Sequence, residues 1–204
     1  METCERYAES YRTGLAAKML AALSFAVLTG IGGRLAFHLG FTPVPVTFQV
    51  LCVILSGLVL GGRWGAISQM QYLAMGAMGF PFFTGVAFGP AAFVGPTGGY
   101  LFGFIAGAYV CGSLYQHLKD RTFTAAWIAG VAGILAIYSL GAPWLACWLR
   151  VAGKSWSDSI LGAWQLGVAP FIGIDLLKAA AASGLAFGGR SWRGLAEPFR
   201  NMGW

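Results

Sequence analysis

An acidic and a basic residue stand three positions apart in the segment Phe171–Ala182, which is otherwise apolar. On a helix, Asp175 and Lys178 would share one face, where each charge can partly neutralise the other. A charge at the centre of a bilayer costs about 2.5–3.5 kcal/mol on insertion scales, so two such charges in one span indicate a functional or structural role. We expect the pair to form the floor of a site for a small molecule. A structural ion pair that fixes two helices together is the alternative.

The composition is that of a polytopic membrane protein. Of the 204 residues, 57% are hydrophobic and only 10% are charged, whereas a soluble domain usually carries about 25% charged residues. The 31 glycines and the 15% aromatic residues fit the same class, because Gly allows close packing of transmembrane helices while Trp and Tyr collect at the membrane interfaces. We therefore expect an all-α fold in a single membrane domain that covers residues 1–204.

Six hydrophobic runs are each long enough to cross about 30 Å of hydrocarbon once tilt is allowed. The six transmembrane helices are expected at 14–39, 46–62, 64–80, 98–117, 123–149 and 162–187. None of them is expected to be a removable signal peptide, since the first run is too long and the tail before it mixes acids with bases. The compact bundle would thus occupy about 14–187, with short tails on both sides.

The distribution of basic residues predicts the orientation. With the N-terminus inside, nine of the 13 Lys and Arg lie in cytoplasmic segments: Arg6, Arg12, Lys18, Arg63, Lys119, Arg121, Arg190, Arg193 and Arg200. Only Arg34, Arg150 and Lys154 lie in outer segments. This bias follows the positive-inside rule, so both termini should be cytoplasmic. The net charge of +6 serves this orientation and does not indicate nucleic-acid binding.

No motif predicts a metal, a cofactor or a nucleotide site. The four cysteines lack CxxC spacing, and Cys52, Cys111 and Cys147 are expected to be small packing residues. Lys154 lies in the tripeptide Gly-Lys-Ser, but Trp148 stands where a phosphate-binding loop requires its first Gly. If the protein moves a solute uphill, the energy would therefore come from elsewhere.

Two loops are expected to enclose a cavity. In Phe41–Gln49, prolines at 43 and 45 keep the backbone extended. An extended backbone at membrane depth is stable only where protein or water satisfies its N–H and C=O groups. This segment would cover the cavity and offer Thr47 and Gln49 as hydrogen-bonding groups, unless it is an ordinary outer loop. The uncharged loop Gly79–Gly95 would form an apolar flap folded onto the protein. Its phenylalanines could instead anchor it at the membrane interface; they are Phe80, Phe82, Phe83, Phe88 and Phe93.

The fourth span opens with a glycine repeat. Gly95, Gly99, Gly103 and Gly107 recur every four residues and would leave a groove along which another helix packs closely. Tyr100, at the mouth of this helix, is the residue of the segment that could touch a ligand.

Four motifs resemble those of the BioY biotin transporters in order and spacing, from about Leu15 to Phe187. They are Pro43-x-Pro45-Val46-Thr47-x-Gln49, Gly79-Phe80-Pro81-x-Phe83, Gly95-Pro96-Thr97-Gly98-Gly99-Tyr100 and Asp175-Leu176-Leu177-Lys178. Proteins of this family are the substrate-binding S components of energy-coupling-factor uptake systems. The resemblance implies a six-helix bundle in the bacterial cytoplasmic membrane that binds biotin with high affinity near the outer surface. It also implies toppling within the membrane, driven by a transmembrane coupling protein and two cytoplasmic ATPases.

The resemblance also assigns residues. Asp175 and Lys178 match the family's pair that contacts the biotin head, and this agrees with their chemistry. An ionised Asp175 can accept from a ureido N–H, and Lys178 can donate to the ureido carbonyl. The carboxylate end could meet Thr47, Gln49 or the backbone amides around Thr97, with Arg34 assisting electrostatically.

A face of small residues on the first span matches the family's contact with the coupling protein. The candidates in its two AxxxA repeats are Ala17, Ala21, Ala22 and Ala26, although packing inside the bundle would equally explain them. The chain departs from the family at Gly173-Ile174, where Pro-Gly is usual, so the helix break there should be weaker or shifted. It departs again at Val86–Pro90, which replaces a glycine-rich segment and should stiffen the flap.

Two other functions are open to such a sequence. A membrane-embedded enzyme could use Asp175 and Lys178 as acid and base, since a desolvated Lys can become nucleophilic. No Ser or Cys clusters with a His to support this. A channel or a purely structural bundle is disfavoured because no span carries a repeated polar stripe.

Overall fold

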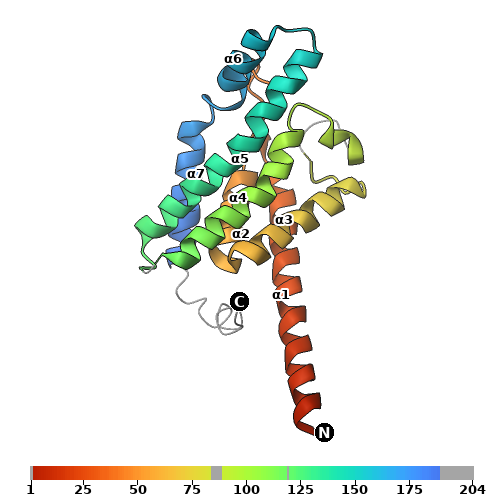
Figure 1. Cartoon of the computed structure of the whole chain (residues 1–204), viewed down its shortest axis with the longest axis vertical. Coiled ribbons are helices and arrows are strands. Elements are labelled where there is room, and N and C mark those ends of the chain that lie inside the picture. The colour runs from red at the N-terminus through yellow and green to blue at the C-terminus, as the bar shows by residue number, and fades with distance from the viewer. Residues whose placement is uncertain (1, 84–88, 119, 189–204) are drawn as a thin grey trace.

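The computed structural model describes residues 2–83, 89–118 and 120–188, with side chains from residue 14 onward. These residues form seven α-helices, one 3₁₀ helix and two short strands (Figure 1). The α-helices are α1 (Glu2–Arg34), α2 (Gln49–Leu60), α3 (Gly62–Ala77), α4 (Gly98–His117), α5 (Phe123–Val151), α6 (Trp156–Gly167) and α7 (Ile172–Gly188). The 3₁₀ helix is η1 (Gly89–Phe93), and the strands β1 (Ala36–Phe37) and β2 (Val46–Thr47) form an antiparallel ribbon.

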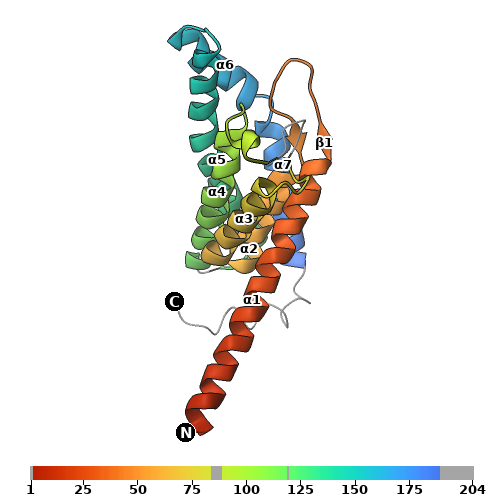
Figure 2. The same ribbon diagram turned by 90° about the vertical axis from the view of Figure 1, so that its right-hand side faces the viewer.

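The central layer of the bundle is α4, which packs against α5, α3 and α2. On one side α2 and α5 contact α7, and on the other α1 lies along α3 and α2. Figure 2 shows α1 running past the end of the bundle toward the N-terminus, while α6 lies at the opposite end beside the end of α5. The fold is therefore helical throughout the bundle, as expected, and the two-residue strands are a local feature of the loop after α1.

Six crossings are not confirmed by helix length and composition. Within the described residues, Gly14–Arg34 and α5 are long and apolar enough to span a bilayer. The helices α2 and α3, of 12 and 16 residues, are shorter than the spans expected at 46–62 and 64–80. Helix α4 has the bounds that the sequence predicts, and α5 extends only two residues past its predicted end at 149.

The predicted span 162–187 is wrong as one continuous helix. It is divided into α6 and α7, which together are apolar enough for one crossing but meet at an angle of 44°. The break covers 168–171 and contains Pro170, which has no N–H to donate. Gly173 and Ile174 lie within α7, so the break is shifted upstream of the position where the family usually has Pro-Gly.

Glycines allow α4 to approach its neighbours. A Cβ on Gly103 would lie 2.9 Å from the carbonyl oxygen of Ile137, and one on Gly107 would lie 3.0 Å from that of Gly133. The repeat on α4 is thus a packing face against α5, as its spacing predicts. On another face of α4, a Cβ added to Gly57 of α2 would lie 2.6 Å from the carbonyl oxygen of Ala108.

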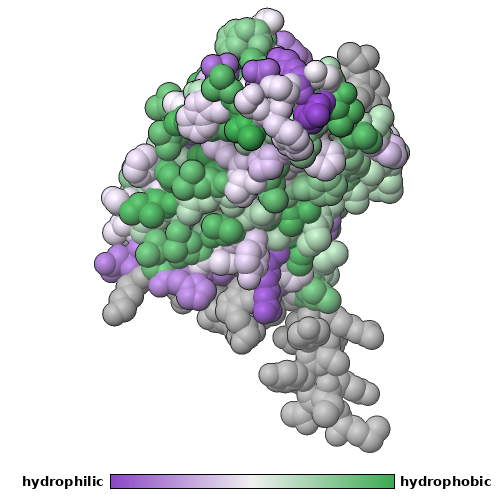
Figure 3. Space-filling model, turned by 45° about the horizontal axis from the view of Figure 1, so that its top comes forward, coloured by the Kyte–Doolittle hydropathy of each residue, from purple (hydrophilic) through white to green (hydrophobic). Residues whose placement is uncertain are grey.

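The surface is that of a protein surrounded by lipid. In Figure 3, hydrophilic side chains gather mainly toward the two ends of the visible face, and a largely hydrophobic surface lies between them. Large apolar side chains such as Leu135 (62% exposed) and Leu177 (72%) point outward. Cys52 and Cys111 are buried packing residues as expected, whereas Cys147 is exposed, which corrects the expectation for that residue.

Candidate ligand-binding site

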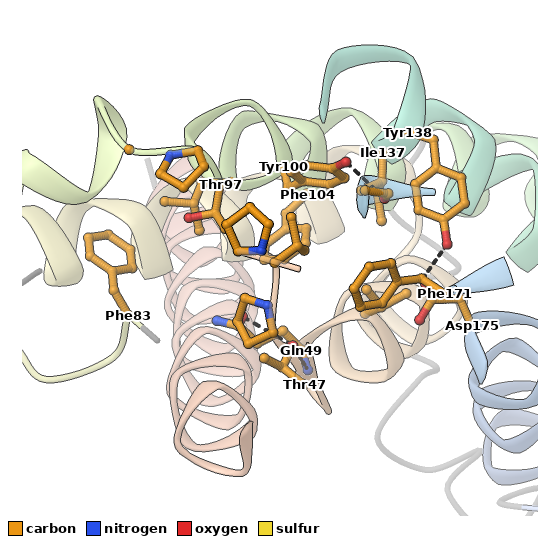
Figure 4. Close-up of a pocket in the computed structure, with 18 of the residues that line it drawn as sticks. Thr47, Gln49, Phe83, Thr97, Tyr100, Phe104, Ile137, Tyr138, Phe171 and Asp175 are labelled. Atoms are coloured by element: carbon orange, nitrogen blue, oxygen red, sulfur yellow. Dashed lines mark hydrogen bonds between the residues drawn. The ribbon is translucent and has the colours of Figure 1, made fainter. Parts of the chain in front are cut away.

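A cavity of about 200 Å³ lies inside the bundle, between the segment after α1, the flap before α4, and helices α4, α5 and α7. All six residues that the sequence assigns to a binding site line it: Thr47, Gln49, Thr97, Tyr100, Asp175 and Lys178. Figure 4 shows five of these six side chains by label around the same space. The cavity thus joins residues that lie up to 140 positions apart, since the lining extends from His38 to Lys178.

The charged pair lies at the α7 side of the cavity. Lys178 Nζ is 2.7 Å from Asp175 Oδ1, and their side chains are 10% and 4% exposed. The second carboxylate oxygen, Oδ2, accepts a hydrogen bond of 2.6 Å from the hydroxyl of Tyr138 on α5. Both members of the ion pair lie on α7, so the pair itself does not fix two helices together. The hydrogen bond from Tyr138 links α5 to α7.

This arrangement suits a neutral polar ligand with adjacent donors and acceptors. Ionised Asp175 has acceptor sites beyond the two hydrogen bonds it receives, and the Lys178 ammonium has three hydrogens, of which Asp175 takes one. Both charges already have a partner, so an uncharged ligand can bind without leaving either of them unpaired. The pair can therefore offer an acceptor and a donor side by side in a dry site.

The middle of the cavity is apolar. Phe104, Ile137 and Phe171 line it together with the ring of Tyr100 (Figure 4), and all four are buried. The Tyr100 hydroxyl donates a 2.8 Å hydrogen bond to the carbonyl of Gly167, in the last turn of α6. Tyr100 therefore faces the cavity with its ring, while its hydroxyl fixes α4 to α6.

The proline segment covers the cavity, as predicted. Pro43 and Pro45 line it, and they lie in the connection between strands β1 and β2, in which Ala36 pairs with Thr47. Thr47 and Gln49 are buried, and the Thr47 hydroxyl donates to Gln49 Oε1 at 3.3 Å. The Gln49 amide also donates to the hydroxyl of Tyr72 on α3, so these polar groups are held in a network at the cavity wall.

The N-terminus of α4 adjoins the cavity, close to the start of the apolar wall at Tyr100. Thr97 is its N-cap and lines the cavity, but its side chain makes no capping hydrogen bond. The first N–H groups of a helix attract anions. Arg34 ends α1, is exposed and is not among the lining residues, so a direct contact between it and a ligand in this cavity is not supported.

The described part of the flap folds onto the protein. Phe83 lines the cavity, is only 2% exposed, and packs edge-to-face against Tyr72 (5.6 Å between ring centroids) and Phe93 (5.4 Å). Phe82 is half-buried, whereas Phe80 is 50% exposed. Phe88, and with it the substitution at 86–88, lies outside the described residues; Pro90 is described, in η1. The described phenylalanines thus divide between a wall of the cavity and the outer surface.

Sequence reasoning missed Tyr138 and the apolar residues Phe104, Ile137 and Phe171. Nothing in the sequence distinguishes the last three from other apolar residues in helices. Tyr138 did carry a signal, because a Tyr within an apolar span needs a partner for its hydroxyl. The nearest charged candidate in the neighbouring span was Asp175.

The four alanines of α1 differ in exposure. Ala22 and Ala26 are fully buried within this chain, so packing inside the bundle accounts for both. Ala17 is exposed and Ala21 is half-buried. Only the N-terminal end of this face, at Ala17 and Ala21, therefore remains open to another protein.

Comparison of sequences matches residues 6–195 to the BioY family. The biotin transporter BioY of Thermotoga maritima is 38% identical over 169 residues, which cover 83% of this chain and 93% of that protein. The biotin transporter BioY of Rhizobium etli is 36% identical over 172 residues, covering 81% and 88%. A probable biotin transporter BioY of Pyrococcus horikoshii is 38% identical over 158 residues, covering 78% and 86%.

Comparison of folds finds the crystal structure of the S component for biotin from an ECF-type ABC transporter. The two structures match with a TM-score of 0.76 and 26% sequence identity, over 90% of this chain and 95% of the other. The resemblance in sequence motifs is thus accompanied by a resemblance of the whole fold.

Proposed function

Since the chain belongs to the BioY family, we propose that it captures biotin in the cavity and delivers it for uptake, as the S component of an energy-coupling-factor transporter. The single observation that carries this proposal is the position of the Asp175–Lys178 pair, buried at one side of an otherwise mainly apolar cavity. Biotin combines a neutral cyclic urea with an apolar ring and chain, and the cavity presents complementary groups in that order.

The ureido ring binds at the charged pair. One ureido N–H donates to Asp175, and the ureido carbonyl accepts from Lys178, while Tyr138 keeps the carboxylate in place. The thioether ring and the aliphatic chain lie against Tyr100 and Phe171. The biotin carboxylate then reaches Thr97 and the first N–H groups of α4, where the helix dipole favours a negative charge.

In the membrane, the bundle crosses the bilayer six times with both termini in the cytoplasm of a bacterium. The short helices α2 and α3 and the bent pair α6–α7 count as three of these crossings. The excess of basic residues in the expected cytoplasmic segments supports this orientation. Helices shorter than the hydrocarbon thickness can be accommodated by local thinning of the bilayer.

The partners that supply energy are a transmembrane coupling protein and two cytoplasmic ATPases. The S component with the matching fold comes from an ECF-type ABC transporter, which supports such an assembly here. On this chain the contact with the coupling protein includes Ala17 and Ala21, since these two are the alanines of the α1 face that are not fully buried. Ala22 and Ala26 contribute by holding α1 against the bundle.

Isothermal titration of the detergent-purified protein against a panel of vitamins tests the proposal. Saturable binding of biotin, with one molecule per chain and none of the other vitamins bound, is the expected result. Failure of a folded preparation to bind biotin contradicts it. The relatives from Thermotoga maritima and Rhizobium etli are named as transporters, which leaves an enzyme that uses Asp175 and Lys178 as acid and base without support. Intact recovery of biotin after equilibrium dialysis distinguishes the two, because turnover would yield a changed product.

A further inference from the structure

A second hollow of about 380 Å³ lies on the outside of the bundle, between α5 and α6. Its lining shares no residue with the ligand cavity. On α5 it follows Ala142, Ala146 and Cys147, and on α6 it follows Trp156, Ile160 and Trp164. We call this hollow the α5–α6 groove. All of these side chains are apolar, so the groove must be filled by an apolar group in the membrane.

The size of the groove matches part of one acyl chain. Ala142, Ala146 and Arg150 are four positions apart on α5, and therefore lie along one face of that helix. The eight positions from Ala142 to Arg150 correspond to about 12 Å at 1.5 Å per residue. One leaflet of hydrocarbon is about 15 Å thick. Arg150 lies beyond the lining residues of α5, which end at Cys147, while the α6 wall extends over eight positions, from Trp156 to Trp164. The groove is therefore shorter than a single leaflet and does not cross the membrane.

A basic group closes one end of the groove. The Arg150 guanidinium lies 5.9 Å from the centre of the Trp156 ring, which forms the wall, and it donates to the carbonyl of Lys154 at 3.1 Å. In the part of the chain that the structure describes, neither Arg150 nor Lys154 has a carboxylate within 4.0 Å. The nearby Asp158 carboxylate accepts from the Ser155 hydroxyl at 2.6 Å. Two basic residues therefore lie beside the Trp156 end of the groove, where a lipid phosphate could reach them.

We propose that the α5–α6 groove binds one glycerophospholipid with an anionic headgroup. One acyl chain fills the groove, and the phosphate binds Arg150, whose planar guanidinium can make two parallel hydrogen bonds to it. A zwitterionic headgroup would place its own cation near Lys154, so the pair of basic residues favours a headgroup with net negative charge. Trp156, the lining residue that contacts Arg150, would lie nearest the membrane interface, where Trp is usually enriched.

Native mass spectrometry of the delipidated full-length protein tests the headgroup preference, with equal amounts of dioleoyl phosphatidylglycerol and dioleoyl phosphatidylcholine in the detergent. The expected result is one retained phosphatidylglycerol. Arg150→Gln and Lys154→Gln should each lower the preference about 5-fold, the usual contribution of one basic residue at a membrane surface. Arg121→Gln is the matched control, because its guanidinium also stacks on a ring, that of Tyr115 at 5.2 Å, and neither residue lines the α5–α6 groove.

Brominated acyl chains locate the lipid, since bromine quenches tryptophan fluorescence only at close range. Brominated phosphatidylglycerol should quench the wild-type protein more than Trp164→Phe, and the difference should disappear in Arg150→Gln. Equal retention of the two lipids, equal losses in Arg150→Gln and Arg121→Gln, or no quenching assigned to Trp164 would each overturn the proposal. If Trp164 is shielded from lipid only in a concentration-dependent dimer, a second copy of the chain fills the groove and the proposal fails.

Discussion

Tyr138 of α5 and Asp175 of α7 are joined by a 2.6 Å hydrogen bond between a hydroxyl and a carboxylate oxygen. The other oxygen of the same carboxylate accepts from Lys178. Each of the two oxygens therefore has its own donor, and the donors come from different helices. This fixes the plane of the carboxylate before any ligand enters, which reduces the ordering that binding would otherwise require.

Replacement of Tyr138 by Phe should weaken biotin binding about 2- to 10-fold, the range of one ordinary hydrogen bond. The carboxylate of Asp175 would keep its ion pair but lose the donor that orients it. Titration calorimetry measures the change. Tyr109→Phe is the control, since Tyr109 is also on a helix and is 50% exposed away from the cavity. Unchanged affinity in Tyr138→Phe would show that the hydrogen bond has no part in positioning Asp175.

Asp175→Asn and Lys178→Ala should each weaken biotin binding at least about 10-fold, because each removes a charge-assisted hydrogen bond to the ureido group. Asp175→Asn also leaves the ammonium of Lys178 buried without its counter-ion, so its melting temperature in detergent should fall. Binding and melting must therefore be measured on the same preparation. Asp120→Asn, which changes an exposed carboxylate between α4 and α5, should alter neither quantity. Wild-type affinity in both site variants would remove these residues from the site.

Thr97→Val should weaken the binding of biotin about 2- to 10-fold while leaving the binding of biotinamide nearly unchanged. The reason is that the proposed role of Thr97 is confined to the carboxylate end of the ligand. Competition assays with both ligands give the ratio directly. Thr124→Val provides a control at an exposed Thr near the start of α5. An equal loss for the two ligands would place the carboxylate elsewhere.

Gly103→Ala should destabilise the protein by about 1–3 kcal/mol, the usual cost of overpacking. The new Cβ would lie 2.9 Å from the carbonyl oxygen of Ile137, and a backbone atom of α5 cannot move aside as a side-chain end could. Gly184→Ala is the matched change on α7, where nothing lies within 4 Å of the added carbon. That variant should be neutral or slightly stabilised, because Ala is the better helix former. Thermal melting in one detergent would compare the two variants.

The sequence predicted the residues of the candidate site better than it predicted the helices. Asp175, Lys178 and Thr97 could be recognised because charge or a motif distinguishes them from an apolar background. All six predicted residues line one cavity. By contrast, the residues of the apolar wall could not be selected, since their importance depends on which helix faces they share, and that is settled only by packing. Tyr138 could have been considered as a partner for a buried charge, but its pairing with Asp175 also depends on packing.

Helix boundaries failed where hydropathy alone was used. The runs at 46–62 and 64–80 stay apolar past the ends of their helices, so hydropathy could not show that these helices end at Leu60 and Ala77. In the last span the break was expected near Gly173, whereas it lies at 168–171 and contains Pro170. Proline chemistry was the more reliable sign there, because a missing N–H interrupts a helix wherever tertiary packing does not compensate.

The interruption before α7 has an electrostatic consequence. It makes Ile172 the start of a new helix and places Asp175 in its first turn. The N–H groups of Ile172 and Asp175 already donate to the carbonyls of Val168 and Phe171. What remains at this end is the positive pole of the helix dipole, which favours a negative charge close by. In an unbroken span Asp175 would stand mid-helix, with no such field and only Lys178 and Tyr138 as partners. The bent backbone thus adds a third favourable interaction for a negative charge at this position.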